Sequence, residues 1–199
     1  MKLIFHIDVN SAFLSWTACG LLEEGGADTP ATDIREIASV IGGSEKSRHG
    51  IVLAKSTLAK QYGIVTGEPL FQARRKCPGL VVVPPNYQLY VRKSDQLIRM
   101  LHEYTPLIQQ YSIDEAWMDM TGIQEAQADP MGFATGLKDR IHRELGFTVN
   151  IGISVNHLLA KMGSELQKPD RVHTLFPEEI PQKMWPLPVN ELFFVGKTT

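Results

Sequence analysis

Two adjacent carboxylates, Asp114 and Glu115, lie between two apolar, strand-like segments. On a straight strand their side chains would point to opposite faces, and one of them would enter the core, where a lone carboxylate is costly. A turn removes this conflict, so the pattern predicts a hairpin of residues 107–113 and 116–120 with the pair at or beside its tip. Acidic residues are also common in solvated turns, so the pair alone does not distinguish a reactive site from a polar turn.

A third carboxylate, Asp8, lies near the end of an apolar segment, 2–9, that is predicted to be a strand. The order strand, helix, hairpin, helix, strand is that of a β-α-β-β-α-β unit, in which the first two strands run in the same direction. The hairpin tip should therefore lie at the same end of the sheet as Asp8. Three carboxylates there repel one another unless divalent cations neutralise them, and oxygen ligands favour Mg²⁺ or Mn²⁺. Two such ions about 4 Å apart suit in-line phosphoryl transfer.

The other elements are predicted from apolar periodicity and from capping and stop residues. Asn10 or Ser11 is placed to cap the first helix. The predicted helices cover residues 10–19, 58–62, 68–76, 87–104, 129–145 and 157–167, and the strands outside the hairpin cover 2–9, 37–41, 50–54, 80–83 and 148–154. The expected fold class is α+β: a ferredoxin-like β-α-β-β-α-β sheet with a small α/β domain inserted after the first strand.

Composition describes a folded protein rather than a disordered or fibrous one, since 43% of the 199 residues are hydrophobic and 21% are charged. Cys19 and Cys77 form neither a disulfide framework nor a metal-binding spacing, which suits a reducing compartment. The apolar start meets Asp8 before it could form a signal-peptide core, and no apolar run is long enough to span a bilayer. We therefore expect a cytoplasmic protein.

Charge is distributed unevenly along the chain. Residues 46–99 contain ten Lys and Arg against Glu68 and Asp95, a balance of +8, so the remainder carries −10 of the total of −2. A basic segment beside an acidic one suggests a polyanion held by one part of the molecule and metal ions held by the other. A solvated charged surface would give the same pattern, so the feature alone leaves nucleic-acid binding open.

Three motifs together resemble those of the Y-family DNA polymerases of the DinB/UmuC group. They are HIDVNSAF at 6–13, YSIDEA at 111–116, and GISVNHLLAKM at 152–162 with QKP at 167–169. The resemblance covers essentially the whole chain. In order and at suitable separations, the three motifs are far more specific than any one of them.

The resemblance implies roles for the acidic residues and for one aromatic residue. Asp8, Asp114 and Glu115 would hold two Mg²⁺ ions that activate the primer 3′-hydroxyl and bind the dNTP phosphates. The Val9 carbonyl would be an additional ligand. Phe13 matches the aromatic steric gate, which presses on the C2′ face of the sugar and leaves no room for a ribonucleotide's 2′-hydroxyl. Without the family context, Phe13 would be interpreted as a core aromatic.

The resemblance also implies phosphate-binding residues, some of which depart from the family pattern. Lys168 matches the lysine that contacts the triphosphate, and Lys161 lies on the helical stretch before it. Thr57 and Lys60 stand where many relatives carry a tyrosine and an arginine on the incoming phosphates. Lys60 retains a point charge without the bidentate fork, and Thr57 retains a hydroxyl on a shorter arm. Asn10 replaces an acidic residue common in relatives, a change that the three main ligands should tolerate.

The implied architecture is a catalytic palm, residues 1–19 and 77–170, and small fingers, residues 20–76, followed by a connector, 171–199. Within the connector, residues 187–196 resemble the approach to a helix-hairpin-helix thumb. We expect a thumb and a little finger beyond it, and expect this fragment alone to be poorly active. The whole protein would carry out translesion synthesis in DNA repair and damage tolerance, with primer–template DNA, dNTPs and a sliding clamp as partners.

Two other interpretations remain. Another palm-type nucleotide enzyme, such as a cyclase, shares the sheet and the paired metals, but the Gly-rich cyclase signature is absent, and Phe13 and Lys168 argue against it. A non-catalytic mutasome subunit would keep the fold only to bind partners. Intact Asp8, Asp114 and Glu115 disfavour that interpretation, because a degenerate site would be free to lose them.

Overall fold

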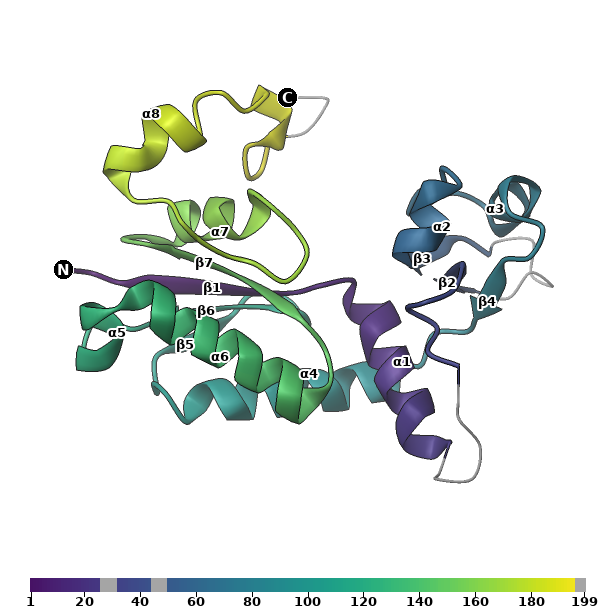
Figure 1. The fold of residues 1–199 in the computed structure, drawn as a ribbon, viewed down its shortest axis with the longest axis horizontal. Coiled ribbons are helices and arrows are strands. Elements are labelled where there is room, and N and C mark those ends of the chain that lie inside the picture. The colour runs from purple at the N-terminus through teal and green to yellow at the C-terminus, as the bar shows by residue number, and fades with distance from the viewer. Residues whose placement is uncertain (26–31, 44–49, 196–199) are drawn as a thin grey trace. The chain divides into compact units, whose positions relative to one another are not determined.

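The computed structural model describes residues 1–25, 32–43 and 50–195 (Figure 1). The chain divides into two compact units: Met1–Asn10 with Ser94–Thr199, and Ser11–Lys93. Among the helices of the described residues, none is both long enough and apolar enough to cross a membrane. Part of the predicted basic segment, Lys46 and Arg48, lies outside the described residues, as does Gly196 at the end of the stretch that resembles the approach to a thumb.

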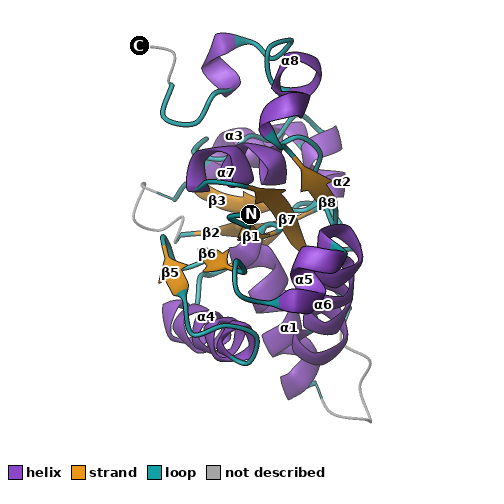
Figure 2. Cartoon of the chain, turned by 90° about the vertical axis from the view of Figure 1, so that its left-hand side faces the viewer, coloured by secondary structure: helices purple, strands orange, loops and turns teal. Residues whose placement is uncertain are grey.

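In the described part of the first unit, strands form one sheet in the order β5-β6-β1-β7-β8 (Figure 2). They are β1 (Ile4–Val9), β5 (Ile108–Gln110), β6 (Glu115–Asp119), β7 (Val149–Ser154) and β8 (Val172–Thr174). The strand β1 pairs antiparallel with β6 on one side and with β7 on the other. Because β5 and β6 form the predicted antiparallel hairpin, β5 runs in the same direction as β1. The predicted ferredoxin-like order is confirmed.

Helices cover both faces of this sheet (Figure 1): α7 (His157–Glu165) lies on one face, and α5 (Gln124–Ala128) and α6 (Pro130–Leu145) lie on the other. The helix α6 starts and stops as its sequence predicts. The Asp129 side chain accepts a hydrogen bond from the Gly132 N–H at 2.9 Å, and Gly146 ends the helix with φ 79°. The helix α4 (Tyr87–His102) crosses the border between the two units.

Several short elements of the first unit were not predicted, among them α5 and β8. The helix α5 has five residues and no side-chain cap, so it lacks the apolar repeat that identifies longer helices. The strand β8 lies in the proline-rich tail and pairs parallel with β7. It is stabilised by backbone hydrogen bonds to a strand about 20 residues earlier, and the sequence of the tail alone does not predict that pairing. The tail continues through short helical turns, η2 (Pro177–Glu179), α8 (Ile180–Lys183) and η3 (Val189–Glu191).

The central strand β1 is buried along its whole length, which accounts for its apolar sequence. His6 and Asp8 are the polar exceptions in it, and both are buried. Alternate residues of a strand face the same side of a sheet, so these two side chains share a face. A buried polar group costs free energy unless it is paired. His6 and Asp8 must therefore have polar partners nearby, and these partners locate the candidate site on the sheet.

The strand β7 and the helix α7 approach each other at two glycines. The Cα of Gly152 lies 3.3 Å from the position that a Cβ on Gly163 would take. A Cβ on Gly152 would lie 1.9 Å from the Ala160 carbonyl oxygen and 2.3 Å from the Ser164 nitrogen, which are backbone atoms that cannot rotate away. Gly152 therefore sets how closely α7 packs on the sheet.

We expect Gly152→Ala to lower the free energy of unfolding by about 3 kcal/mol or more, since overpacking costs about 1–3 kcal/mol even where neighbours can yield. Thermal melting should show a Tm lower by roughly 6–12 °C, at about 2–4 °C per kcal/mol for a chain of this size.

Gly136→Ala is the matched control, because Gly136 is an exposed residue of α6 with no atom within 4 Å of an added Cβ. There alanine should raise stability by about 0.5–1 kcal/mol through its helix propensity. Equal melting temperatures for the two variants would contradict the role given to the β7–α7 approach.

The second unit contains a small sheet in the order β3-β2-β4, with β2 antiparallel to β3 and parallel to β4. Its elements are α1 (Ala12–Glu24), β2 (Ser39–Gly42), β3 (Val52–Lys55), α2 (Thr57–Gln61), α3 (Leu70–Lys76) and β4 (Val81–Val83). Each overlaps a predicted element, but α1 continues past its predicted end at residue 19. Gly20 lies inside this helix, where an added Cβ would be 2.7 Å from Leu89 Cδ2.

The borders of the two units do not coincide with those predicted for the palm and the fingers. The units change over after residues 10 and 93, whereas the predicted domains change over after residues 19 and 76. The reason is packing: Leu14 and Ala18 of α1 form an apolar cluster with Ile34 and Ile41. The helix that follows Asp8 therefore packs into the core of the second unit.

Candidate active site

Asp8 and Glu115 are brought together by the sheet. They are directly paired in the antiparallel register of β1 and β6. Among the described residues, they form with His6 a group whose ligand atoms all lie within 4.8 Å of one another. This proximity agrees with the convergence that the topology predicted for Asp8 and the acidic pair.

Asp114 joins the same region through its backbone. Its carbonyl oxygen accepts a hydrogen bond from the Val9 N–H at 3.1 Å, while its carboxylate accepts one from the Ser112 hydroxyl at 2.7 Å. The carboxylate of Asp114 is not a member of the group formed by Asp8 and Glu115. Asp114 lies in the turn and Glu115 is the first residue of β6, so the two adjacent side chains leave the backbone in different directions.

A buried lysine bridges the two converging carboxylates. Lys161 Nζ lies 3.2 Å from Asp8 Oδ2 and 2.7 Å from Glu115 Oε2. The lysine comes from α7, which reaches the site because Gly152 lets that helix pack closely on β7. Lysine is almost never buried unless paired, so this position depends on the carboxylates.

Two further charged residues complete the cluster. Lys168 Nζ donates to Asp8 Oδ1 at 2.8 Å. Glu165 Oε1 accepts from both lysine ammonium groups, Lys161 and Lys168, at 2.9 Å each. Lys161 and Lys168 were predicted as site residues, whereas Glu165 was not. The sequence feature that could have identified Glu165 is its i, i+4 spacing from Lys161 on a predicted helix.

Burial and ion pairing move the pKa values of the cluster in different directions. Burial raises the pKa of Asp8 above its usual range, against the opposing charges of Lys168 and Lys161. For Glu115, burial acts in the same direction, but the contact with His6 Nε2 at 3.2 Å and the hydrogen bond from Lys161 prevail and lower the pKa to about 2. Burial disfavours the charged Lys161, yet Asp8 and Glu115 outweigh it and raise the pKa of the ammonium group. At neutral pH the site therefore holds a cationic lysine against an anionic Glu115.

His6 links the site to α7, and the sequence predicted no role for it beyond its place in the first motif. Its Nδ1 lies 2.8 Å from Ser164 Oγ, and its Nε2 lies 3.2 Å from Glu115 Oε2. Burial lowers the pKa of the imidazole, so the ring is favoured in its neutral form. The period-2 spacing from Asp8 was the signal that could have identified it.

Asn10 is fixed by hydrogen bonds within the first unit. Its Nδ2 donates to Asn150 Oδ1 at 3.0 Å, and its Oδ1 accepts from Thr148 Oγ1 at 3.0 Å and from the Asp170 N–H at 2.9 Å. Asn10 thus joins the end of β1 to both ends of the β7–α7 segment. A carboxylate there could accept these bonds but could not donate to Asn150.

The remaining predicted site residues lie in the second unit. Phe13 is half-buried on α1, and its ring stacks on Tyr90 with centroids 4.5 Å apart and planes 7° apart. Tyr90 is fully buried, and its hydroxyl lies 2.9 Å from Thr17 Oγ1. Thr57 and Lys60 are exposed residues of α2. Phe13 is thus held by a fixed aromatic neighbour, while Thr57 and Lys60 face solvent.

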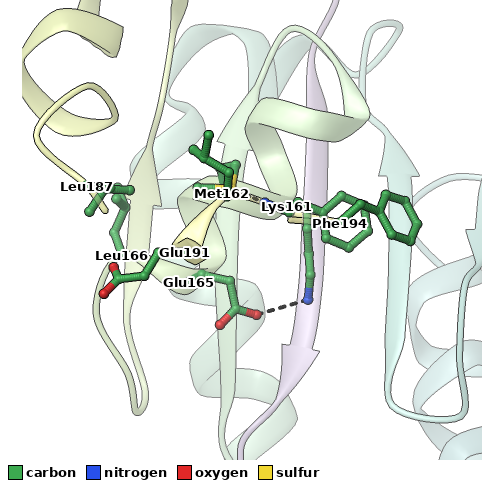
Figure 3. A pocket seen from close by; sticks show the side chains of 9 residues that line it. Lys161, Met162, Glu165, Leu166, Leu187, Glu191 and Phe194 are labelled. Carbon is green, nitrogen blue, oxygen red and sulfur yellow. Dashed lines mark hydrogen bonds and ion pairs between the residues drawn. The ribbon is translucent and has the colours of Figure 1, made fainter. Parts of the chain in front are cut away.

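A cavity of about 460 Å³ adjoins the charged cluster (Figure 3). It is lined by Lys161, Glu165 and Glu191 and by apolar residues at the end of α7 and in the connector. In the connector, the Phe193 ring centroid lies 5.8 Å from Lys161 Nζ. The Phe193 N–H donates to the Met162 sulfur at 3.3 Å. The connector therefore contacts the same helix that carries the bridging lysine.

Comparison with known proteins gives a consistent result. The sequence pattern of the impB/mucB/samB family matches residues 7–165. A protein named DNA polymerase IV from Clostridium acetobutylicum is 57% identical over 197 residues, which is 99% of this chain and 48% of that protein. DNA polymerase IV 1 from Bacillus subtilis is 38% identical, over 100% of this chain and 45% of its own length. The chain thus spans about half the length of these relatives.

Solved structures support the same fold. The crystal structure of DinB from Sulfolobus solfataricus matches with a TM-score of 0.83 and 23% identity, over 98% of this chain and 55% of that one. An insertion ternary complex of Dbh DNA polymerase matches with the same TM-score and 21% identity, also over 98% and 55%. At these identities the likeness establishes the α+β fold.

Proposed function

The chain belongs to the impB/mucB/samB family, and we propose that it supplies the catalytic part of a Y-family DNA polymerase. The reaction is template-directed transfer of a dNMP to a primer 3′-hydroxyl. The observation that carries the proposal is the pairing of Asp8 with Glu115 across β1 and β6, beside two lysine ammonium groups. Carboxylates that hold cations, next to cations that hold phosphates, are what nucleotidyl transfer requires.

The residues present fit a divalent metal centre. Asp8 and Glu115 offer carboxylate oxygens within 4.8 Å of one another, and the Lys161 ammonium group between them is a stand-in for a cation. We propose that Asp8, Asp114 and Glu115, with the Val9 carbonyl, hold two Mg²⁺ ions, for which Mn²⁺ could substitute. Bound there, the ions would lower the pKa of the primer hydroxyl and neutralise the triphosphate. The chain's own part is to fix the carboxylates on neighbouring strands.

The substrate-binding roles are assigned in the same proposal. Lys168, whose Nζ lies 2.8 Å from Asp8 Oδ1, contacts the triphosphate beside the metal centre. Lys60 and Thr57 supply a charge and a hydroxyl to the incoming phosphates, which their exposure on α2 permits. Phe13 is the steric gate against ribonucleotides. Its stacking on buried Tyr90 gives the gate the rigidity that a steric filter needs.

The wider setting follows from the same family membership. We propose that residues 1–19 and 77–170 form the palm, that residues 20–76 form the fingers, and that residues 171–199 lead toward a thumb and a little finger. The whole protein would act in the cytoplasm on primer–template DNA with dNTPs, and would synthesise past damaged bases. A sliding clamp would bind a part of the protein beyond this chain.

The function is tested by primer extension with Mg²⁺, using the full-length protein in which these 199 residues occur. Thermal melting is the companion measurement, since Mg²⁺ with dNTP should raise the Tm of a protein with an intact nucleotide site. Ligand-induced stabilisation without extension would favour a different nucleotide enzyme. Neither extension nor stabilisation would favour the non-catalytic subunit.

A further inference from the structure

Four charged side chains form a closed ring beside the metal ligands. Asp8 accepts from Lys161 at 3.2 Å and from Lys168 at 2.8 Å. On the opposite side of the ring, Glu165 Oε1 accepts from the same two ammonium groups, each at 2.9 Å. Lys168 therefore has two carboxylate partners, Asp8 on the central strand and Glu165 at the end of α7. Lys161 has the same two and also Glu115.

Lys161 occupies space that a metal ion would need. Its Nζ is within hydrogen-bond distance of Asp8 Oδ2 and Glu115 Oε2, which are oxygens of the two carboxylates proposed as metal ligands. A Mg²⁺ ion approaches its oxygen ligands to about 2.1 Å. An ammonium group on the same oxygens would then face a divalent cation at close range and compete for their lone pairs. The repulsion between the two cations therefore opposes their binding to these oxygens at the same time.

We propose that Lys161 is an exchangeable counter-ion of the metal centre, and that Glu165 retains its ammonium group when a divalent cation takes its place on Asp8 and Glu115. The inference deepens the proposed function and rests on it. Lys161 is a positioning residue here, because it acts through the occupancy of the carboxylates.

The surroundings of Lys161 provide a place for the released ammonium group. Glu165 lies one helical turn away on α7 and already accepts from Lys161, as Figure 3 shows. The Glu165 side chain is 40% exposed, so it can follow the lysine without breaking core packing. The adjoining cavity is lined by both residues, and the Phe193 ring lies 5.8 Å from Nζ as a second favourable neighbour. The lysine can therefore leave Asp8 and Glu115 while staying paired.

Direct titration with Mn²⁺, followed by electron paramagnetic resonance, tests the exchange without any turnover. In the protein that contains the whole chain, Lys161→Met should bind Mn²⁺ about 5-fold or more tightly than the unchanged protein, the lower end of typical coupling between competing ligands. Lys183→Met is the matched control, since Lys183 forms an i, i+4 ion pair with Glu179 away from this cluster. It should leave the Kd unchanged. An unchanged or weaker Kd in Lys161→Met would overturn the proposal.

Glu165→Gln separates retention of the lysine from a general charge effect. Without the Glu165 carboxylate, Lys161 is left on Asp8 and Glu115, so Mn²⁺ should bind about 5-fold more weakly. In the Lys161→Met background the same change should have little effect, because there is no ammonium group to retain. An equal weakening in both backgrounds would contradict the role of Glu165. If Lys161→Met folds poorly, Lys161→Gln can replace it in both arms of this comparison. Glu165→Gln should fold normally, because Glu165 is exposed.

Failure of this inference can be told from failure of the proposed function. If Asp8→Ala leaves Mn²⁺ binding intact, or the unchanged protein binds none, the metal centre itself is wrong. If Asp8→Ala abolishes binding while Lys161→Met does not strengthen it, the metal centre stands and the exchange is wrong.

Discussion

Asp8→Ala is expected to lower kcat/KM for primer extension by more than about 100-fold, because even the residues behind metal ligands contribute about 10–100-fold. Asp8 is buried on the central strand, pairs with Glu115 and accepts from two lysines, so alanine removes a carboxylate from the centre of the site. Single-turnover extension with Mg²⁺, by a protein that contains the whole chain, measures the effect. Asp114→Ala should also abolish extension, although the Asp114 carboxylate bonds to Ser112 in this structure.

The control for Asp8 is Asp95→Ala, which removes an exposed carboxylate from α4 and should leave extension unchanged. Melting of both variants shows whether the fold is retained, and Asp8→Asn preserves the side-chain shape if the alanine variant unfolds. Extension that survives both Asp8→Ala and Asp114→Ala would refute the assignment of the metal ligands.

Phe13→Ala is expected to raise ribonucleotide incorporation relative to deoxyribonucleotide incorporation by about 10- to 100-fold. An unrelieved steric overlap costs about 1–3 kcal/mol, and each 1.4 kcal/mol corresponds to a factor of about ten in rate. Because Phe13 is stacked on buried Tyr90, its ring cannot retreat from a 2′-hydroxyl, and alanine removes the obstacle entirely. The ratio of kcat/KM for an rNTP and the matching dNTP measures the change.

Phe71→Ala is the matched control for Phe13, since Phe71 is a phenylalanine of the same unit that is 61% exposed on α3. Its removal should leave sugar discrimination as it was. Loss of extension with both sugars in Phe13→Ala, at an unchanged ratio, would count against the steric gate and favour a packing role.

The convergence of Asp8 and Glu115 could be predicted because it follows from topology. Once 107–120 was interpreted as a hairpin in a β-α-β-β-α-β unit, the direction of each strand was determined, and with it the edge at which the acidic residues meet. Which of Asp114 and Glu115 would join Asp8 could not be predicted. The answer depends on whether the strand after the turn begins at Asp114 or at Glu115, and such boundaries are uncertain by one or two positions.

The charged ring of lysines and carboxylates was only partly predictable. The i, i+4 spacing of Lys161 and Glu165 follows from helical geometry, but the reach of Lys161 to Asp8 depends on how closely α7 packs on β7. That distance is determined by Gly152 and Gly163, whose effect appears only when the two backbones are placed together. The strand β8 was missed for a similar reason, since its pairing with β7 is not local.

The position of β1 between β6 and β7 determines at which stage of folding the site forms. Asp8 and Glu115 are 107 positions apart and meet through the pairing of β1 with β6, while β7 pairs with the other edge of β1. Pairing of such distant segments forms late and is lost only when the whole unit opens. The amide protons of β1 should therefore exchange with solvent at the rate of global unfolding, and a partly folded nascent chain should have no affinity for divalent cations at this place.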